Sequence, residues 1–96
     1  MADVTSGITI KRLGNDEAGA LIVTTAATVD DGDTLTVTLA DYGISSVLGI
    51  SGFIHTTTDS VIVAEAPETA VSAGVLTVTV GGSTDNKKRA FVIWGE

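Results

Sequence analysis

The chain has one histidine, His55, and no cysteine. Disulfides, thiolate catalysis and cysteine zinc sites are therefore excluded, as is any mechanism that needs two imidazoles within one chain. Ser51, Ser60 and Asp59 lie near His55 in the sequence, so a Ser-His-Asp set can be written down. The sequence contains no Gly-x-Ser-x-Gly nucleophile elbow. We interpret His55 as an ordinary strand residue near a turn, and we predict no catalytic residue and no enzymatic activity.

Four aspartates, Asp30, Asp31, Asp33 and Asp41, carry hard oxygen ligands of the kind that calcium prefers. Their spacing does not fit an EF-hand loop, and no glutamate follows at the required distance. Asp-Gly clusters are typical of turns, because both residue types tolerate turn backbone angles. We therefore predict a turn here and no metal site.

Two further acidic pairs, Asp16-Glu17 and Glu65/Glu68, lie in or beside predicted turns. Nothing in their surroundings indicates the burial that raises a carboxyl pKa for acid–base catalysis. The glycine pair at 81–82 lacks the lysine and the following helix of a phosphate-binding loop. We expect no cofactor.

Composition favours strands and turns. Thr, Val and Ile make up 35 of the 96 residues, glycine contributes 11 and proline one. β-branched side chains suit a pleated surface. A net charge of −7, from 12 acidic and 5 basic residues, argues against nucleic-acid binding. The longest apolar runs are far shorter than the roughly 20 residues of a membrane-spanning helix, and we expect no membrane partner.

The hydrophobic pattern predicts about seven strands separated by breaks every 8–14 residues. Strict alternation is clearest at 34–39 and 75–80, and the ranges 50–56 and 61–66 read as a hairpin. The other strands are expected at 6–13, 19–29 and 87–94, with polar breaks at 14–17 and 81–86 and either a loop or one helical turn within 41–49. The pattern predicts an all-β fold, an antiparallel β-sandwich or small jelly-roll-like barrel. We expect residues 1–7 to form an N-terminal arm and residues 8–96 to form a single β-domain.

Self-association is the next expectation. Mean hydropathy is +0.41 and only 18% of residues are charged, against about 25–35% charged residues on the surface of a well-behaved small domain. So short a chain must leave apolar side chains outside, and contiguous exposed apolar area marks protein contacts. We therefore expect a homo-oligomer or a subunit of a larger assembly.

Basic residues are confined to the two ends. Ten acidic residues and no basic residue lie between residues 13 and 86. This separation of basic from acidic residues has two interpretations. In the first, the acidic residues lie in solvated turns and the basic residues keep an exposed edge strand from pairing with another chain. In the second, the basic segment of one subunit contacts the acidic surface of another. Tryptophan is enriched at interface centres, which adds Trp94 to the candidates. The predicted interface residues are Lys11, Arg12, Lys87, Lys88, Arg89 and Trp94.

The stretches 39–48, 52–58, 61–67 and 85–95 resemble segments of small β-rich proteins of tailed bacteriophages, among them the capsid decoration, or cement, proteins. The resemblance covers most of the chain from about Ile8 onward. It implies a structural protein on the outer surface of the virion, made in the host cytoplasm, that stabilises the capsid by bridging major capsid protein subunits. It also implies that the homo-oligomer is a trimer or another cluster, with the trimer favoured. The start of the chain lacks the basic and apolar regions of a secretion signal, so we expect it to be used as it stands. Two alternatives stay open: another virion subunit of the tail, fibre or head–tail joint, and a soluble module that binds carbohydrate or a cell surface.

Overall fold

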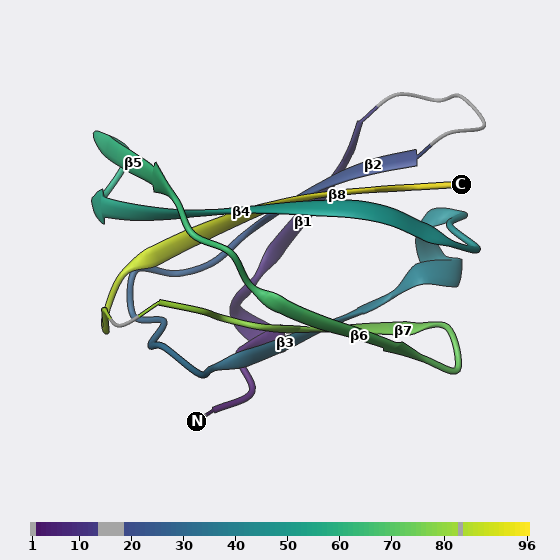
Figure 1. The fold of residues 1–96 in the computed structure, drawn as a ribbon, viewed down its shortest axis with the longest axis horizontal. Helices are drawn as coiled ribbons and strands as arrows, with labels where there is room; N and C mark the ends of the chain where they lie inside the picture. Colours follow the sequence, from purple (N-terminus) through teal and green to yellow (C-terminus); the bar gives the residue numbers. More distant parts are fainter. Residues whose placement is uncertain (1, 14–18, 83) are drawn as a thin grey trace.

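In the part of the chain that the structure describes, the fold consists of eight β-strands and two short 3-10 helices (Figure 1). The computed structural model describes residues 2–13, 19–82 and 84–96. The predicted break at 14–17, with its Asp16-Glu17 pair, lies outside these residues. In chain order the elements are η1 (Thr5–Gly7), β1 (Thr9–Leu13), β2 (Gly19–Thr24), β3 (Thr34–Thr38), η2 (Leu39–Tyr42), β4 (Val47–Thr57), β5 (Val61–Ala64), β6 (Glu68–Ser72), β7 (Val75–Thr79) and β8 (Lys88–Gly95).

The strands form two antiparallel sheets, which confirms the predicted sandwich. One sheet has five strands in the order β1-β2-β8-β4-β5, and the other has three in the order β3-β7-β6. Figure 1 shows the two sheets edge-on, with the chain from β5 to β6 passing from the upper sheet to the lower one. The barrel alternative is not what forms. The chain switches sheets between β2 and β3, between β3 and β4, between β5 and β6, and between β7 and β8.

The core lies between the sheets and follows the predicted alternation. In β3 and β7 the residues Leu35, Val37, Leu76 and Val78 are buried, and the threonines that alternate with them are partly or fully exposed. Twelve apolar side chains form the buried cluster: Leu21, Val23, Val29, Leu35, Val37, Leu39, Ile44, Leu76, Val78, Val80, Phe91 and Ile93. Ile8 and Ile10, predicted to share a face, both pack against this cluster. In β2, by contrast, Ile22 lies on the opposite face from Leu21 and Val23 and is only partly buried.

Strand β6 is the one that the pattern did not predict. It pairs with β7 across a two-residue turn in which Ala73 and Gly74 both have positive φ, 52° and 78°. That geometry is the type I′ hairpin turn, whose twist matches the flanking strands. Pro67 ends the preceding strand segment as expected, because proline cannot donate to a ladder. The sequence of β6 shows no apolar alternation, and every residue of it is exposed.

The predicted hairpin of β4 and β5 is confirmed, and it turns at residues 58–60 with a register irregularity between His55 and Thr57. The stretch 41–49 differs from its prediction: the 3-10 turn, η2, comes earlier, ends at Gly43 in the left-handed region at φ 71°, and β4 already begins at Val47. No helix among the described residues has the length and apolarity that a membrane-spanning helix requires.

The described part of the predicted arm, residues 2–7, runs beside β3. Val4 donates its N–H to the Thr34 carbonyl at 2.7 Å, and Thr34 donates to the Ala2 carbonyl at 2.8 Å. The Thr36 N–H donates to the hydroxyl of Thr5 at 3.0 Å. This segment therefore covers the outer edge of β3 before the chain enters β1 in the other sheet.

Candidate interaction surface

His55 has a structural partner in the β4–β5 turn. Its Nδ1 accepts the Asp59 N–H at 3.0 Å, and the residue is only 8% exposed. This hydrogen bond assigns the ring proton to Nε2. The Lys88 ammonium donates to Asp59 Oδ1 at 2.7 Å, and this hydrogen bond together with its Coulombic attraction lowers the pKa of the Asp59 carboxyl. Ser51 lies four residues back along β4, about 13 Å away at strand spacing. Nδ1 of His55 is taken by the Asp59 N–H, and among the described residues no hydrogen bond joins the Ser60 hydroxyl to the ring.

The aspartates of the 30–33 turn bind backbone N–H groups. Asp33 Oδ2 accepts the Asp30 N–H and Oδ1 accepts the Ala2 N–H, both at 2.9 Å. The hydrogen bond from Asp30 lowers the pKa of the buried Asp33 carboxyl, against the opposing effect of burial. Asp30 Oδ1 in turn accepts the Asn86 N–H at 2.8 Å. These carboxylates hold the turn and the N-terminal segment together. In the part of the chain that the structure describes, no three His, Asp or Glu residues are grouped to hold a metal ion.

Arg89 is not at the surface, where its place in a basic cluster predicted it. Its side chain is fully buried, and Nε donates to Glu65 Oε1 at 3.2 Å. Its Nη1 donates to the carbonyls of Val29 and Lys87, and Nη2 donates to the carbonyl of Thr84. Arg89 alternates with Ala90 in β8, so it points inward with the apolar residues of that strand. Burial removes Arg89 from the predicted interface.

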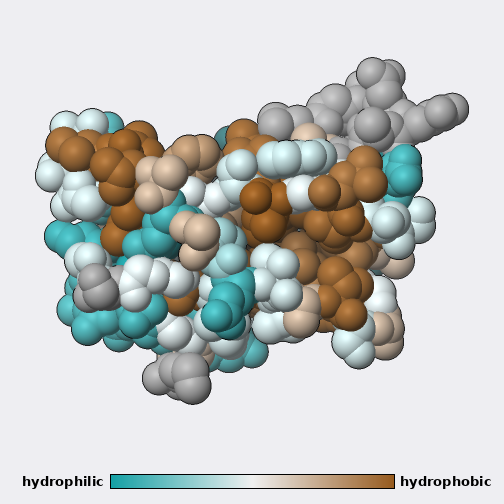
Figure 2. Space-filling model, viewed as in Figure 1, coloured by the Kyte–Doolittle hydropathy of each residue, from teal (hydrophilic) through white to brown (hydrophobic). Residues whose placement is uncertain are grey.

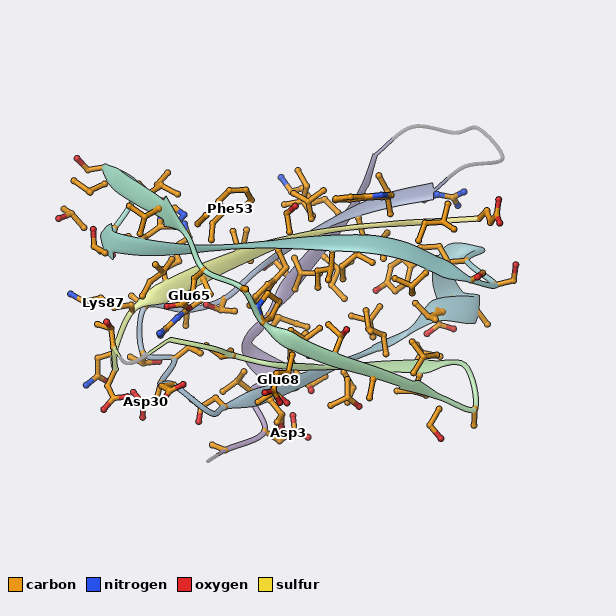
Figure 3. The ribbon with its side chains drawn as sticks, in the orientation of Figure 1. Asp3, Asp30, Phe53, Glu65, Glu68 and Lys87 are labelled. Carbon is orange, nitrogen blue, oxygen red and sulfur yellow. The ribbon has the colours of Figure 1, made fainter. Side chains whose placement is uncertain are left out.

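The other predicted interface residues lie in separate places. Lys11 and Arg12 are exposed on the edge strand β1. Lys87, labelled in Figure 3, donates to the Thr56 carbonyl at 3.2 Å, and Lys88 is bound to Asp59 in the β4–β5 turn. Trp94 is 41% exposed near the end of β8. Their role at an interface stays a prediction, and the structure does not bring them together as one patch.

Exposed apolar residues gather instead along one side of the sandwich, where β5 crosses to β6. Figure 2 shows them as brown areas over β5 and between the two sheets at centre right. We call this surface the open side; it comprises β5, the half of β4 at residues 47–52, and β6. Its large side chains and their exposed fractions are Leu48 60%, Val61 48%, Ile62 51%, Val63 47% and Val71 53%.

The backbone of the open side is also uncovered. β5 pairs only with residues 53–57 of β4. The Glu65 N–H donates to the Gly52 carbonyl at 2.9 Å, so this edge of β4 is hydrogen-bonded as far as Gly52. Beyond it, no strand of the described residues lies beside Ile50 on the side away from β8. A hollow of about 350 Å³ lies at this point, lined by residues 50–53 and 64–67.

The four sheet edges among the described residues differ in protection. The edge strand β1 carries Lys11 and Arg12, and the edge of β3 is covered by residues 2–7. β6 begins with Glu68 directly after Pro67. β5 reads Val-Ile-Val-Ala, with no charge, no proline and no covering segment in the described structure. Charge, proline and covering segments are the usual protection against edge pairing, and β5 lacks all three. The sequence analysis did not predict this site, because it considered residues that could catalyse a reaction or bind a ligand. The sequence feature that marks the site is a strand in which apolar residues do not alternate with polar ones.

Comparisons with known proteins give little further information. No family model and no curated protein matches the chain. Among solved structures, the fibre head protein of bovine atadenovirus type 4 aligns over 91% of this chain and 83% of that one, at 10% identity and a TM-score of 0.46. So weak a similarity does not show a common fold. The two-sheet architecture rests on the strand pairing itself.

Proposed function

We propose that the chain is a structural protein of a bacteriophage particle, which decorates the outer surface of the capsid and acts through protein contacts without enzymatic activity. The observation that carries this proposal is the open side, with its apolar edge strand β5. Exposed apolar area of this kind, next to unpaired strand backbone, is typical of surfaces that bind other proteins. The phage context comes from the sequence resemblance alone.

The partner in this proposal is the major capsid protein. An extended segment of the shell could add to the β5 edge through main-chain hydrogen bonds, while Val61, Ile62 and Val63 give apolar contacts. Repeated over many copies, modest contacts of this kind add up through multivalency and bridge neighbouring shell subunits. Such a role requires neither a cofactor nor a metal ion.

Counting copies in purified virus particles tests the proposal directly. Mass spectrometry should find the chain at a copy number comparable to that of the major capsid protein. A handful of copies per particle would overturn decoration and support a tail, fibre or head–tail joining subunit. Absence from the particle would reject a virion role and leave the soluble carbohydrate- or surface-binding module.

A variant pair tests whether the open side makes the contact. Val63→Asp places a charge on the exposed edge strand, on the side that faces the open side, and Thr77→Asp places the same charge on the outer surface of the other sheet. Particles that lack the protein should rebind the wild type and Thr77→Asp but not Val63→Asp. Equal rebinding of all three would exclude the open side, and particles equally stable with and without bound protein would exclude a stabilising role.

A further inference from the structure

The five-stranded sheet has an apolar outer face. Along β8 the buried residues alternate with partly exposed ones, so Val92 and Trp94 point away from the core. The strand register places Val92 beside Ile22 on one side and Ser51 on the other. Phe53 lies on the same face, as Figure 3 shows for its position on the side of β4 away from the three-stranded sheet. We call this surface, which centres on Ile22, Phe53, Val92 and Trp94, the outer face.

The outer surface of the three-stranded sheet provides an internal comparison. Its outward positions are mainly threonines, including Thr36 and Thr77, with Glu68 at the edge (Figure 3). Such side chains are solvated without difficulty, as expected for a sheet with one side in water. The outer face has large apolar and aromatic side chains at the corresponding positions. Exposure to water alone therefore does not explain why the outer face is apolar.

Charge on the outer face is sparse and lies at its margin. Lys11 is on the edge strand, and Lys88, at the beginning of β8, is paired with Asp59 at 2.7 Å. The Lys11 ammonium can extend to water, and the charge of Lys88 is balanced within the chain. The centre of the outer face can be covered without burying a carboxylate.

The outer face is large enough for a stable contact. The five strands contain 34 residues in total, and at about 3.3 Å per residue and about 4.8 Å between strands they give roughly 500 Å². Two such faces together bury roughly 1,000 Å², which is the lower limit for a specific protein interface. Twisted sheets pack face to face at about 10 Å, with their strands roughly aligned.

We propose that the outer face binds the outer face of a second copy of this chain. The same surface on both partners gives a closed two-fold dimer. The apolar centre of one face matches that of the other, whereas the threonine surface of the three-stranded sheet would leave hydroxyls without partners. The dimer leaves the backbone edge of β5 and the side chains of Val61 and Val63 uncovered, whereas Ile62 lies beside His55 on the outer face. This inference rests on the proposed function and names the first partner in the assembly. A dimer differs from the trimer expected from the resemblance, and the measurement below decides between them.

Sedimentation and fluorescence test the contact in the purified full chain. We expect a species of twice the 9.7 kDa chain mass at micromolar concentrations. Trp94 is the single tryptophan and is 41% exposed in the isolated chain, so its emission should shift to shorter wavelength as the dimer forms. A monomer throughout this range, a trimer, or a dimer with unchanged Trp94 emission would overturn the proposal.

Variants locate the contact. Val92→Lys places a cation at the centre of the face and should weaken dimerisation by about 100-fold. Thr77→Lys makes the same change at the centre of the opposite sheet and should leave the dimer intact. Circular dichroism and melting curves establish that each variant folds. If Val92→Lys does not fold, Ile22→Ser, which removes apolar area on the neighbouring strand, takes its place. A dimer that survives Val92→Lys or Ile22→Ser excludes this face.

The two proposals fail separately. Loss of the dimer in Val92→Lys does not depend on any virus particle, so it stands even if the chain is absent from virions. Rebinding of a monomeric Val92→Lys variant to particles would show in turn that the open side acts without the dimer.

Discussion

Nε of Arg89 lies 3.2 Å from Oε1 of Glu65, and this ion pair links residues 65–67, which connect the two sheets between β5 and β6, to strand β8. The Arg89 side chain is fully buried, and that of Glu65 is only 12% exposed. Three backbone carbonyls accept the remaining guanidinium hydrogen bonds. Because β5 ends and β6 begins on either side of this crossover, the ion pair fixes both edges of the open side.

Removing one member of this pair should destabilise the fold. Glu65→Ala leaves a buried guanidinium without its counter-charge, and we expect a loss of about 3 kcal/mol in the free energy of unfolding, as for other broken buried pairs. Urea denaturation measures this loss. Glu68→Ala removes an exposed carboxylate three residues away and should change stability by less than about 0.5 kcal/mol. Equal stabilities of the two variants would show that the ion pair contributes little.

Acid stability should depend on Asp33. The pKa of its carboxyl is lowered in the folded chain, mainly by the hydrogen bond from the Asp30 N–H. A lowered folded-state pKa means that the stabilisation is complete above the ordinary value of 3.8 and is lost as the pH falls through the lower folded-state value. Asp33→Asn should therefore be less stable at neutral pH and should lose less stability on acidification. Denaturation at pH values from 6 downward measures both effects, with Asp31→Asn in the same turn as control. Parallel pH curves for Asp33→Asn and wild type would contradict this prediction.

Gly49 makes room for the indole of Trp94. A Cβ at position 49 would lie 2.7 Å from the Cε2 and Cζ2 atoms of the ring. Gly49→Ala should displace the ring from the sheet and lower stability by about 1 kcal/mol, at the low end for overpacking because the side chain can rotate. Trp94 emission and acrylamide quenching report the displacement. Gly7→Ala is the matched control, since a Cβ there meets nothing within 4 Å. Unchanged quenching in Gly49→Ala would show that the ring does not lie there.

A substitution in the turn between β6 and β7 should raise the stability of the fold. Ala73 has φ 52°, in the left-handed region that costs a residue with a Cβ roughly 1–2 kcal/mol, whereas asparagine tolerates it. Ala73→Asn creates the Asn-Gly pair preferred in type I′ turns and should stabilise the fold by about 0.5–1 kcal/mol. Thermal denaturation measures the gain. Gly74→Ala, at φ 78°, should have the opposite effect. Destabilisation by Ala73→Asn would argue against the turn type.

The sequence predicted those parts of the fold that depend on local alternation. The inward residues of β3 and β7 and the β4–β5 hairpin follow from a period of two and from turn residues. β6 was missed because its fully exposed residues carry no inward pattern, and its pairing depends on the turn after it. Arg89 was misplaced for a related reason. A basic residue in a terminal cluster indicates solvent exposure, and only the position of Glu65 across the fold reveals its buried partner.

The candidate surfaces were beyond prediction from local pattern. Whether Val63 is covered depends on how far the second sheet extends, because Val63 lies beside the inward residue Ile54, and this is a property of topology. The outer face likewise needs the register that brings Ile22 beside Val92 from strands nearly 70 residues apart. Composition correctly indicated excess apolar residues, but their location required the sheet order.

Salt should strengthen the dimer that we propose. Two chains of −7 repel one another, and added salt screens this repulsion without weakening the apolar contact. Contact between the basic segment and an acidic neighbour would respond in the opposite way. That contact has few residues left to form it, because Lys88 is bound to Asp59 and Arg89 is bound to Glu65 within the chain. Sedimentation at about 0.05 and 0.5 M NaCl should show a dissociation constant several-fold lower at the higher salt. A higher dissociation constant there would restore the complementary-charge contact and reject the apolar one.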